Sequence, residues 1–341
     1  MKHVFALLAV LSLLLSCSSD GGLPPTPPVT NPEIALPIPA GFPPLNPSVA
    51  ANRPTKYGVL LGEKLFHEKK LSGNNTISCA SCHHPSKAFA DRHAQAIGID
   101  GRVGLRNTPP LQNLAFLRFY NWDGHILQLE KQPLVPIISH EEMDASIVDV
   151  IGKLTDGTEY PGLFRNAFGD DEVTADRIYR SIAQYLYTLV SADSKYDRVM
   201  RNAGEAFTDS EAQGYAVFQQ KCEGCHSTTL FTDQTFRNVG FPVNPSTEEA
   251  GRARVTGKPE DVMRFRVPSL RNAEYTAPYG SFGQFATLRE VLDYFDNGVL
   301  DAGNLDPLLK AQGNRIPLSE QEKEDLISFI KTLNDPAFVG E

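Results

Sequence analysis

Cys79-Ala80-Ser81-Cys82-His83 and Cys222-Glu223-Gly224-Cys225-His226 are two copies of one pattern, Cys-x-x-Cys-His, in a chain of 341 residues. The pattern is typical of covalent c-type haem attachment, in which two thiols bond the porphyrin and the histidine ligates the iron. The two copies contain four of the five cysteines, and no histidine follows His226 to complete a zinc site. The sequence therefore predicts two haems, attached through Cys79, Cys82, Cys222 and Cys225, with His83 and His226 as proximal iron ligands.

The N-terminal region predicts export. Met1-Lys2-His3 precedes an apolar run from Val4 to Leu15, which is too short for a stable transmembrane helix but typical of a signal peptide. Leu14-Leu15-Ser16-Cys17 resembles the lipobox of bacterial lipoproteins, and an ordinary signal peptide cleaved a few residues later is the alternative. We expect removal of residues 1–16 and lipidation of Cys17, which would hold the protein to a bacterial membrane on the periplasmic side.

Residues 17–48 are rich in proline, glycine and serine, and we predict that they form an extended tether. The remaining residues, 49–341, suffice for two domains of ordinary size. The net charge is −9 and the chain has no basic block, which argues against nucleic acid as a partner.

The folded part is predicted to be mainly α-helical. Capping boxes at Thr208–Glu211, Thr287–Glu290 and Ser319–Glu322 each precede apolar residues at helical spacing, and Thr174 is a further expected N-cap. No long run alternates with the period of two that is typical of strands. Each half thus combines a few helices with one Cys-x-x-Cys-His pattern. We predict two cytochrome c-like helical domains, 49–200 and 201–341, each with one covalent haem.

From about Pro54 to Leu333, the chain resembles the bacterial di-haem cytochrome c peroxidases and their relatives of the MauG group. Besides the two haem motifs, the resemblance rests on Leu61-Gly62-Glu63-Lys64-Leu65-Phe66, Leu71-Ser72, Arg106-Asn107-Thr108-Pro109, Trp122-Asp123-Gly124, Val267-Pro268-Ser269-Leu270-Arg271-Asn272, Thr276-Ala277-Pro278-Tyr279 and Thr287-Leu288. It implies that the N-terminal haem reacts with hydrogen peroxide. The C-terminal haem then relays electrons from a small donor, a cytochrome c or a cupredoxin.

The resemblance also implies roles for three residues near the first haem. Glu142 corresponds to the carboxylate that moves a proton between the two peroxide oxygens, and Gln132 lines the same pocket. Trp122, the only tryptophan of the chain, corresponds to the residue that relays oxidising equivalents between the haems. The alternatives are a solvated surface glutamate, since Glu141 is adjacent, and a tryptophan that only packs in the core.

Asn107, Thr276 and Pro278 match the positions that hold a calcium ion between the domains in the family, Pro278 through its carbonyl oxygen. Oxygen ligands suit calcium, although a hydrogen-bonded domain contact without metal is the alternative.

The chain departs from the family at three positions. Ile99 replaces the histidine that blocks the first haem in the classical peroxidases, so we expect an open iron site. Phe295 stands where the relay haem finds its second axial ligand, and we consider Tyr294 first, no protein ligand second and Met263 third. Ser281 replaces a histidine common in the family.

Three functions are compatible with these features. Peroxide reduction is the principal expectation. Oxidation of residues on a partner protein, as in MauG, is the alternative, and electron transfer without catalysis ranks last because it gives Glu142 no role. The oligomeric state, a homodimer included, stays open.

Overall fold

The computed structural model describes residues 30–242 and 248–340. The expected signal peptide at 1–16 and the expected lipidation site Cys17 lie outside the described residues. The described part is mainly helical and contains little sheet, which confirms the predicted α class. Within these residues, no helix combines the length and apolar character that crossing a bilayer requires.

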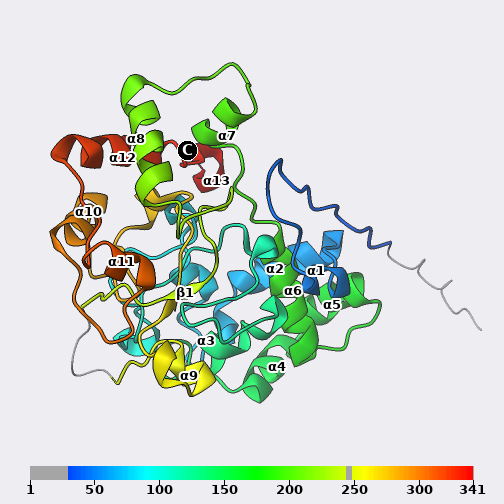
Figure 1. Cartoon of the computed structure of the whole chain (residues 1–341). Helices are drawn as coiled ribbons and strands as arrows, with labels where there is room; N and C mark the ends of the chain where they lie inside the picture. The colour runs from blue at the N-terminus through cyan, green and yellow to red at the C-terminus, as the bar shows by residue number, and fades with distance from the viewer. Residues whose placement is uncertain (1–29, 243–247, 341) are drawn as a thin grey trace, which may run out of the picture.

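The helices of the described residues follow one another along the chain as short segments joined by long loops (Figure 1). They are α1 (Ser48–Ala51), α2 (Lys56–Phe66), α3 (Leu134–Ile138), α4 (Ile147–Thr155), α5 (Glu159–Phe168), α6 (Ala175–Tyr187), α7 (Lys195–Met200), α8 (Asp209–Lys221), α9 (Ala253–Thr256), α10 (Leu288–Asn297), α11 (Pro307–Ala311), α12 (Glu320–Lys331) and α13 (Pro336–Val339). Strands β1 (Phe236–Arg237) and β2 (Phe265–Arg266) pair antiparallel, with Phe236 opposite Arg266.

Helices α2 and α6 cross at the centre of the N-terminal hydrophobic core. Thr55 is the N-cap of α2. Thr174 is the N-cap of α6, as the sequence predicted. The crossing is close because a Cβ on Gly62 would lie only 1.9 Å from the backbone oxygen of Ser181. A glycine is therefore required where the two backbones meet.

Helices α8 and α12 form the equivalent crossing in the C-terminal core. A Cβ on Gly214 of α8 would lie 1.9 Å from the backbone oxygen of Asp325 in α12. The predicted capping boxes begin both helices, at Thr208 and at Ser319. In each half a buried phenylalanine, Phe66 or Phe218, follows the glycine by one helical turn. In Figure 1, α8 and α12 lie at the upper left, and α2 and α6 lie right of the centre.

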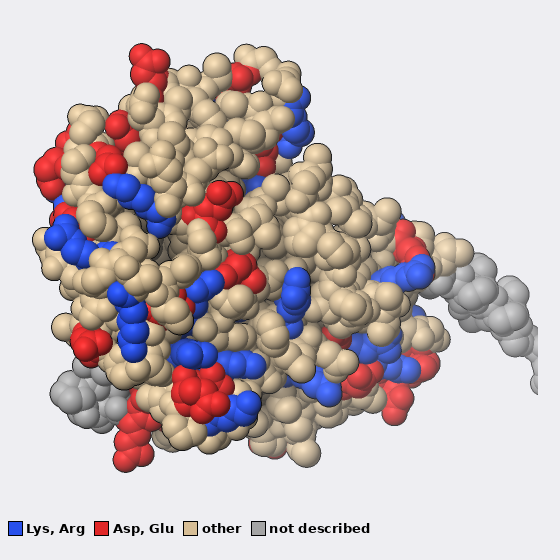
Figure 2. All heavy atoms as spheres, viewed as in Figure 1, with Lys and Arg blue, Asp and Glu red and all other residues tan. Residues whose placement is uncertain are grey.

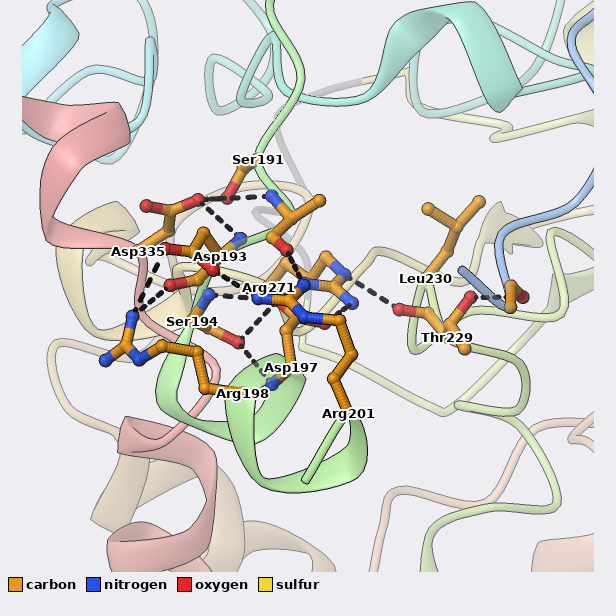
Figure 3. Close-up of polar contacts among 12 residues, drawn as sticks. Ser191, Asp193, Ser194, Asp197, Arg198, Arg201, Thr229, Leu230, Arg271 and Asp335 are labelled. Atoms are coloured by element: carbon orange, nitrogen blue, oxygen red, sulfur yellow. Dashed lines mark hydrogen bonds and ion pairs between the residues drawn. The ribbon is translucent and has the colours of Figure 1, made fainter. Parts of the chain in front are cut away.

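A buried polar network joins the two halves (Figure 3). Asp335, just before α13, accepts hydrogen bonds from the Ser191 hydroxyl and from the backbone N–H groups of Ala192 and Asp193, each at 3.1 Å. The Asn272 side chain also contacts Ser191, at 2.9 Å. The segment that connects the halves is therefore attached to the C-terminal half at several points.

Residues 30–47 differ from the predicted tether because they pack on the folded part. The Asn31 side chain donates to the Thr55 hydroxyl at 3.0 Å and to the backbone oxygen of Ala167 at 2.8 Å. Phe42 belongs to the N-terminal core and meets Phe116 edge to face. A proline-rich segment can be ordered in this way when a few apolar and amide side chains find partners on a neighbouring surface.

On the face drawn in Figure 2, lysine and arginine side chains are interspersed with aspartate and glutamate. The described residues of this face form no extended basic patch, in keeping with the net charge of −9.

Candidate active site

The two Cys-x-x-Cys-His segments adopt the same tight turn. The His83 backbone N–H donates to the Cys79 oxygen at 3.0 Å, and the His226 N–H donates to the Cys222 oxygen at 3.0 Å. The second turn follows α8 directly, since the helix ends at Lys221. The turn brings both cysteines and the histidine of each motif close together, as attachment of one haem requires.

Both histidine rings are oriented by a backbone carbonyl. The Nδ1 atom lies 2.6 Å from the Phe89 oxygen in His83 and 3.0 Å from the Phe231 oxygen in His226. A carbonyl only accepts, so Nδ1 carries the hydrogen and Nε2 keeps its lone pair for a metal. Burial lowers the pKa of His83 to about 4 and also lowers the pKa of His226, so both rings are neutral at pH 7.

Cys79, Cys82 and His83 line a cavity of about 900 Å³. Cofactor sites in proteins typically have volumes of roughly 300–1,000 Å³, so the cavity is large enough for a haem. Its wall includes Thr108, whose buried hydroxyl finds no hydrogen-bond partner among the described residues. A buried hydroxyl without a partner can form a hydrogen bond to a polar group of a bound ligand. The two carboxylates of a haem are such groups. The residues present therefore fit the haem.

Glu142 lies on the wall of this cavity and is half-buried, whereas Glu141 is exposed. Burial raises the pKa of Glu142, and the charge of Glu141 adds to the effect. The Glu142 backbone oxygen accepts from the Ile99 N–H at 2.7 Å, so Ile99 and Glu142 belong to adjoining loops. Gln132 lines the cavity as well, and its amide lies 3.4 Å from the Asn121 side-chain oxygen. The structure thus brings together both residues that we expected near the peroxide.

Trp122 lines the same cavity and forms hydrogen bonds to both halves of the chain. Its indole N–H donates to the Asn107 oxygen at 2.8 Å, and its backbone oxygen accepts from the Arg266 N–H at 2.8 Å. The first hydrogen bond holds the indole ring and the second holds the Trp122 backbone, which is thereby tied to β2 of the C-terminal half.

His125 also lines the cavity, although the sequence did not predict it as a site residue. Its Nδ1 lies 2.6 Å from Asp123, and Asp123 pairs with Arg106 at 2.8 Å. Burial alone would raise the pKa of Asp123, but hydrogen bonds from His125 and Arg106 outweigh it and the pKa lies below the ordinary range. The sequence feature that could have indicated His125 is the spacing Asp123-Gly124-His125, in which the carboxylate precedes the imidazole by two residues.

The expected calcium residues lie at the contact between the halves. The Asn107 N–H donates to the Ser281 oxygen at 2.9 Å, next to the segment that contains Thr276 and Pro278. The Asn107 amide donates to the His93 oxygen at 3.0 Å, and the Thr276 hydroxyl donates to the Ala273 oxygen at 3.2 Å. Calcium binding stays a prediction.

The Tyr294 hydroxyl is engaged in hydrogen bonds. It donates to the Gly240 oxygen at 2.6 Å and accepts from the Leu300 N–H at 3.2 Å. Ligation of the second haem iron by Tyr294 would require the hydroxyl to leave these partners. That ligation stays a prediction, and an unchanged spectrum of the second haem in Tyr294→Phe would exclude it. Met263, the third choice, lies in a loop where its N–H donates to the Ala250 oxygen.

Residues 56–205 match the family described as di-haem cytochrome c peroxidase. The methylamine utilization protein MauG of Methylorubrum extorquens is 36% identical over 300 residues, which cover 86% of this chain and 83% of that protein. The cytochrome c551 peroxidase of Nitrosomonas europaea is 33% identical, with 80% of this chain and 78% of that protein covered. A solved structure of a MauG-like protein associated with microbial copper homeostasis is 28% identical with a TM-score of 0.82, covering 90% of this chain and 97% of that chain.

Proposed function

Since the chain belongs to the di-haem cytochrome c peroxidase family, we propose that it reduces hydrogen peroxide to water with electrons from a small redox protein. It is an oxidoreductase of the peroxidase type, and its family carries two c-type haems. The proposed donor is a small cytochrome c or a cupredoxin, and its electrons enter at the haem attached to Cys222 and Cys225.

The observation that carries the proposal is a half-buried carboxylate, Glu142, in the wall of the cavity above His83. Cys79, Cys82 and His83 would hold the haem, and its iron would supply the redox chemistry for peroxide reduction. The Glu142 carboxylate accepts the proton of the inner peroxide oxygen and returns it to the outer one, which then leaves as water. The Gln132 amide donates a hydrogen bond to the peroxide and orients it toward Glu142.

Trp122 is the proposed relay between the two haem sites. Its bonds to Asn107 and to Arg266 support this role because they keep the indole in one position, and a fixed ring needs little rearrangement when it gains or loses an electron.

Steady-state turnover of hydrogen peroxide with reduced cytochrome c tests the proposed function. We expect oxidation of two cytochrome molecules per peroxide, as the reduction of peroxide to two waters requires. A protein that carries both haems but consumes no peroxide with either a cytochrome or a cupredoxin would exclude the peroxidase function.

Oxidation of a partner protein is the second candidate, favoured by the higher identity to MauG than to the cytochrome c551 peroxidase, 36% against 33%. The same Glu142 and Trp122 would serve it, with the oxidising equivalents withdrawn from residues of the partner. Mass spectrometry of proteins crosslinked to the peroxide-treated enzyme distinguishes the two, because only this function leaves an oxidised partner.

We further propose a calcium ion near Asn107, Thr276 and Pro278, and export with a lipid on Cys17. The buried Ser281 hydroxyl supports the ion because it lies beside Asn107 without a hydrogen-bond partner among the described residues. Chelation should lower the melting temperature of the holoprotein if the ion is bound. Cys17→Ala should release the exported protein from the membrane fraction.

A further inference from the structure

Arg266 on β2 is a buried cation that has no carboxylate partner among the described residues. The residue is only 9% exposed. Among the described residues its side chain has one hydrogen bond, a weak one from Nε to the Asn121 oxygen at 3.5 Å. Burial lowers the pKa of Arg266 to about 10, partly offset by the neighbouring Tyr120, so the guanidinium still carries its charge at pH 7.

The other arginines of the core differ from Arg266 in this respect. Arg106 pairs with Asp123 and Glu249, Arg237 pairs with Asp233 and Asp306, and Arg271 pairs with Asp197, with at least one nitrogen–oxygen distance of 2.8 Å or less in each case. A buried charge is costly unless an opposite charge and hydrogen bonds compensate it. The charge of Arg266 therefore requires an anion to compensate it, and the described residues do not supply one.

Arg266 lies between two cavities, which limits where that anion can sit. One is the cavity of about 900 Å³ above His83, and the other is a cavity of about 30 Å³ behind Trp122. The small cavity has room for about two water molecules, which is too little for a haem and its propionate arm. The anion must therefore approach from the large cavity, where the unpartnered hydroxyl of Thr108 also lies.

None of the three acidic residues on the wall of the large cavity, Asp123, Glu141 and Glu142, forms an ion pair with Arg266. Asp123 is paired with Arg106 and His125, and Glu142 forms no ion pair with Arg266. Of the other cations there, Arg106 is already neutralised and Arg254 is exposed to solvent. Arg266 is thus the one cation of this wall, among the described residues, that is both buried and uncompensated.

We propose that Arg266 binds a propionate carboxylate of the haem attached to Cys79 and Cys82. The planar guanidinium matches a carboxylate with two parallel hydrogen bonds, which a single ammonium cannot reproduce. Because Arg266 belongs to the C-terminal half, this contact joins the first haem to the other half of the chain beside Trp122. A positive charge there favours the reduced, less positive haem and so raises its reduction potential.

This binding role rests on haem attachment alone and is independent of the substrate. The test uses the holoprotein with both haems, whose content is verified by the pyridine haemochrome assay in each variant. We expect Arg266→Gln to shift the midpoint potential of the first haem to more negative values while the second haem is unchanged. The resonance Raman band of propionate bending should move in the same variant. Arg264→Gln, which removes an arginine already paired with Asp261 at 3.5 Å, is the matched control and should leave both readouts as in wild type.

Fully haem-loaded Arg266→Gln with the wild-type potential and propionate band would overturn the proposal, whatever its peroxidase activity. If that variant does not accumulate with both haems, Arg266→Lys replaces it. We expect a displaced propionate band there, because the lysine keeps the charge but loses the paired hydrogen bonds. An unmoved band in Arg266→Lys would equally overturn the proposal.

Discussion

Arg271 and Asp197 form a doubly hydrogen-bonded ion pair in the interior, with both nitrogen–oxygen distances at 2.8 Å (Figure 3). The Arg271 side chain is fully buried, and its Nε donates to the Thr229 oxygen at 2.7 Å. Thr229 lies three residues after His226, and Asp197 lies in α7. The pair therefore connects the segment between the two halves to the turn that carries the second proximal histidine.

We expect Asp197→Asn to lower the free energy of unfolding by about 3–5 kcal/mol, because it leaves the Arg271 charge buried and uncompensated. Urea denaturation of the holoprotein measures the loss. Asp193→Asn is the control, since Asp193 forms exposed ion pairs with Arg198 and Arg201 and should cost at most about 1 kcal/mol. Equal losses in the two variants would contradict the importance of the buried pair.

The same pair predicts a dependence of stability on acid pH. Burial alone would raise the pKa of Asp197, but the hydrogen bonds and charge of Arg271, with Ser194, outweigh it and the pKa is lowered. A carboxylate whose pKa is lower in the folded than in the unfolded state stabilises the protein at pH values above the unfolded-state pKa. This stabilisation is lost as the pH falls toward the folded-state pKa. We expect the urea midpoint of wild type to fall more steeply below about pH 5 than that of Asp197→Asn.

Glu142→Gln should slow the reaction of peroxide with the ferric enzyme by about a hundredfold or more, since an amide cannot take the proton. Stopped-flow spectroscopy of the holoprotein measures the rate. Haem content and melting temperature should match wild type. Glu141→Gln is the control at the neighbouring position. Because Glu141 is exposed, this variant should react with peroxide at the wild-type rate at neutral pH. A Glu142→Gln variant with the wild-type rate would remove this carboxylate from the mechanism.

The rate of the peroxide step should fall as pH decreases through the pKa of Glu142, because only the ionised carboxylate accepts a proton. Burial and Glu141 raise that pKa above 4.5, so the decrease should begin at a higher pH than an ordinary glutamate would give. Glu141→Gln removes one of the two causes. We expect its rate profile to move toward lower pH, and an unmoved profile would show that another group limits the rate.

The first haem should react with peroxide in the fully ferric enzyme. By the family resemblance, Ile99 corresponds to the blocking histidine of the classical peroxidases; it is 3% exposed and has no group that ligates iron. His93, the other histidine of this loop, is exposed and does not line the cavity. Electron paramagnetic resonance of the resting enzyme should show a high-spin ferric component. A wholly low-spin enzyme that is inert until half-reduced would mean that another ligand fills the site.

Local patterns predicted those parts of the structure that depend on neighbouring residues. Thr208, Ser319 and Thr174 cap the helices expected after them, because a side-chain oxygen three residues before a backbone N–H defines a helix start. The closeness of Gly62 to Ser181 was not predictable in this way. It depends on residues more than a hundred positions apart, and a glycine inside a helix has no local signature of its partner.

The sequence by itself determined the two haem attachment turns, since each lies within five consecutive residues and their chemistry needs no distant partner. By resemblance it also named Glu142, Gln132 and Trp122. Only the tertiary structure showed that these residues border the cavity of His83, and that Arg266 from the other half lies in the same wall with no carboxylate partner in the part of the chain that the structure describes. Burial and charge compensation depend on how distant segments pack, so an arginine that reads as ordinary in the sequence becomes informative only when its surroundings are known.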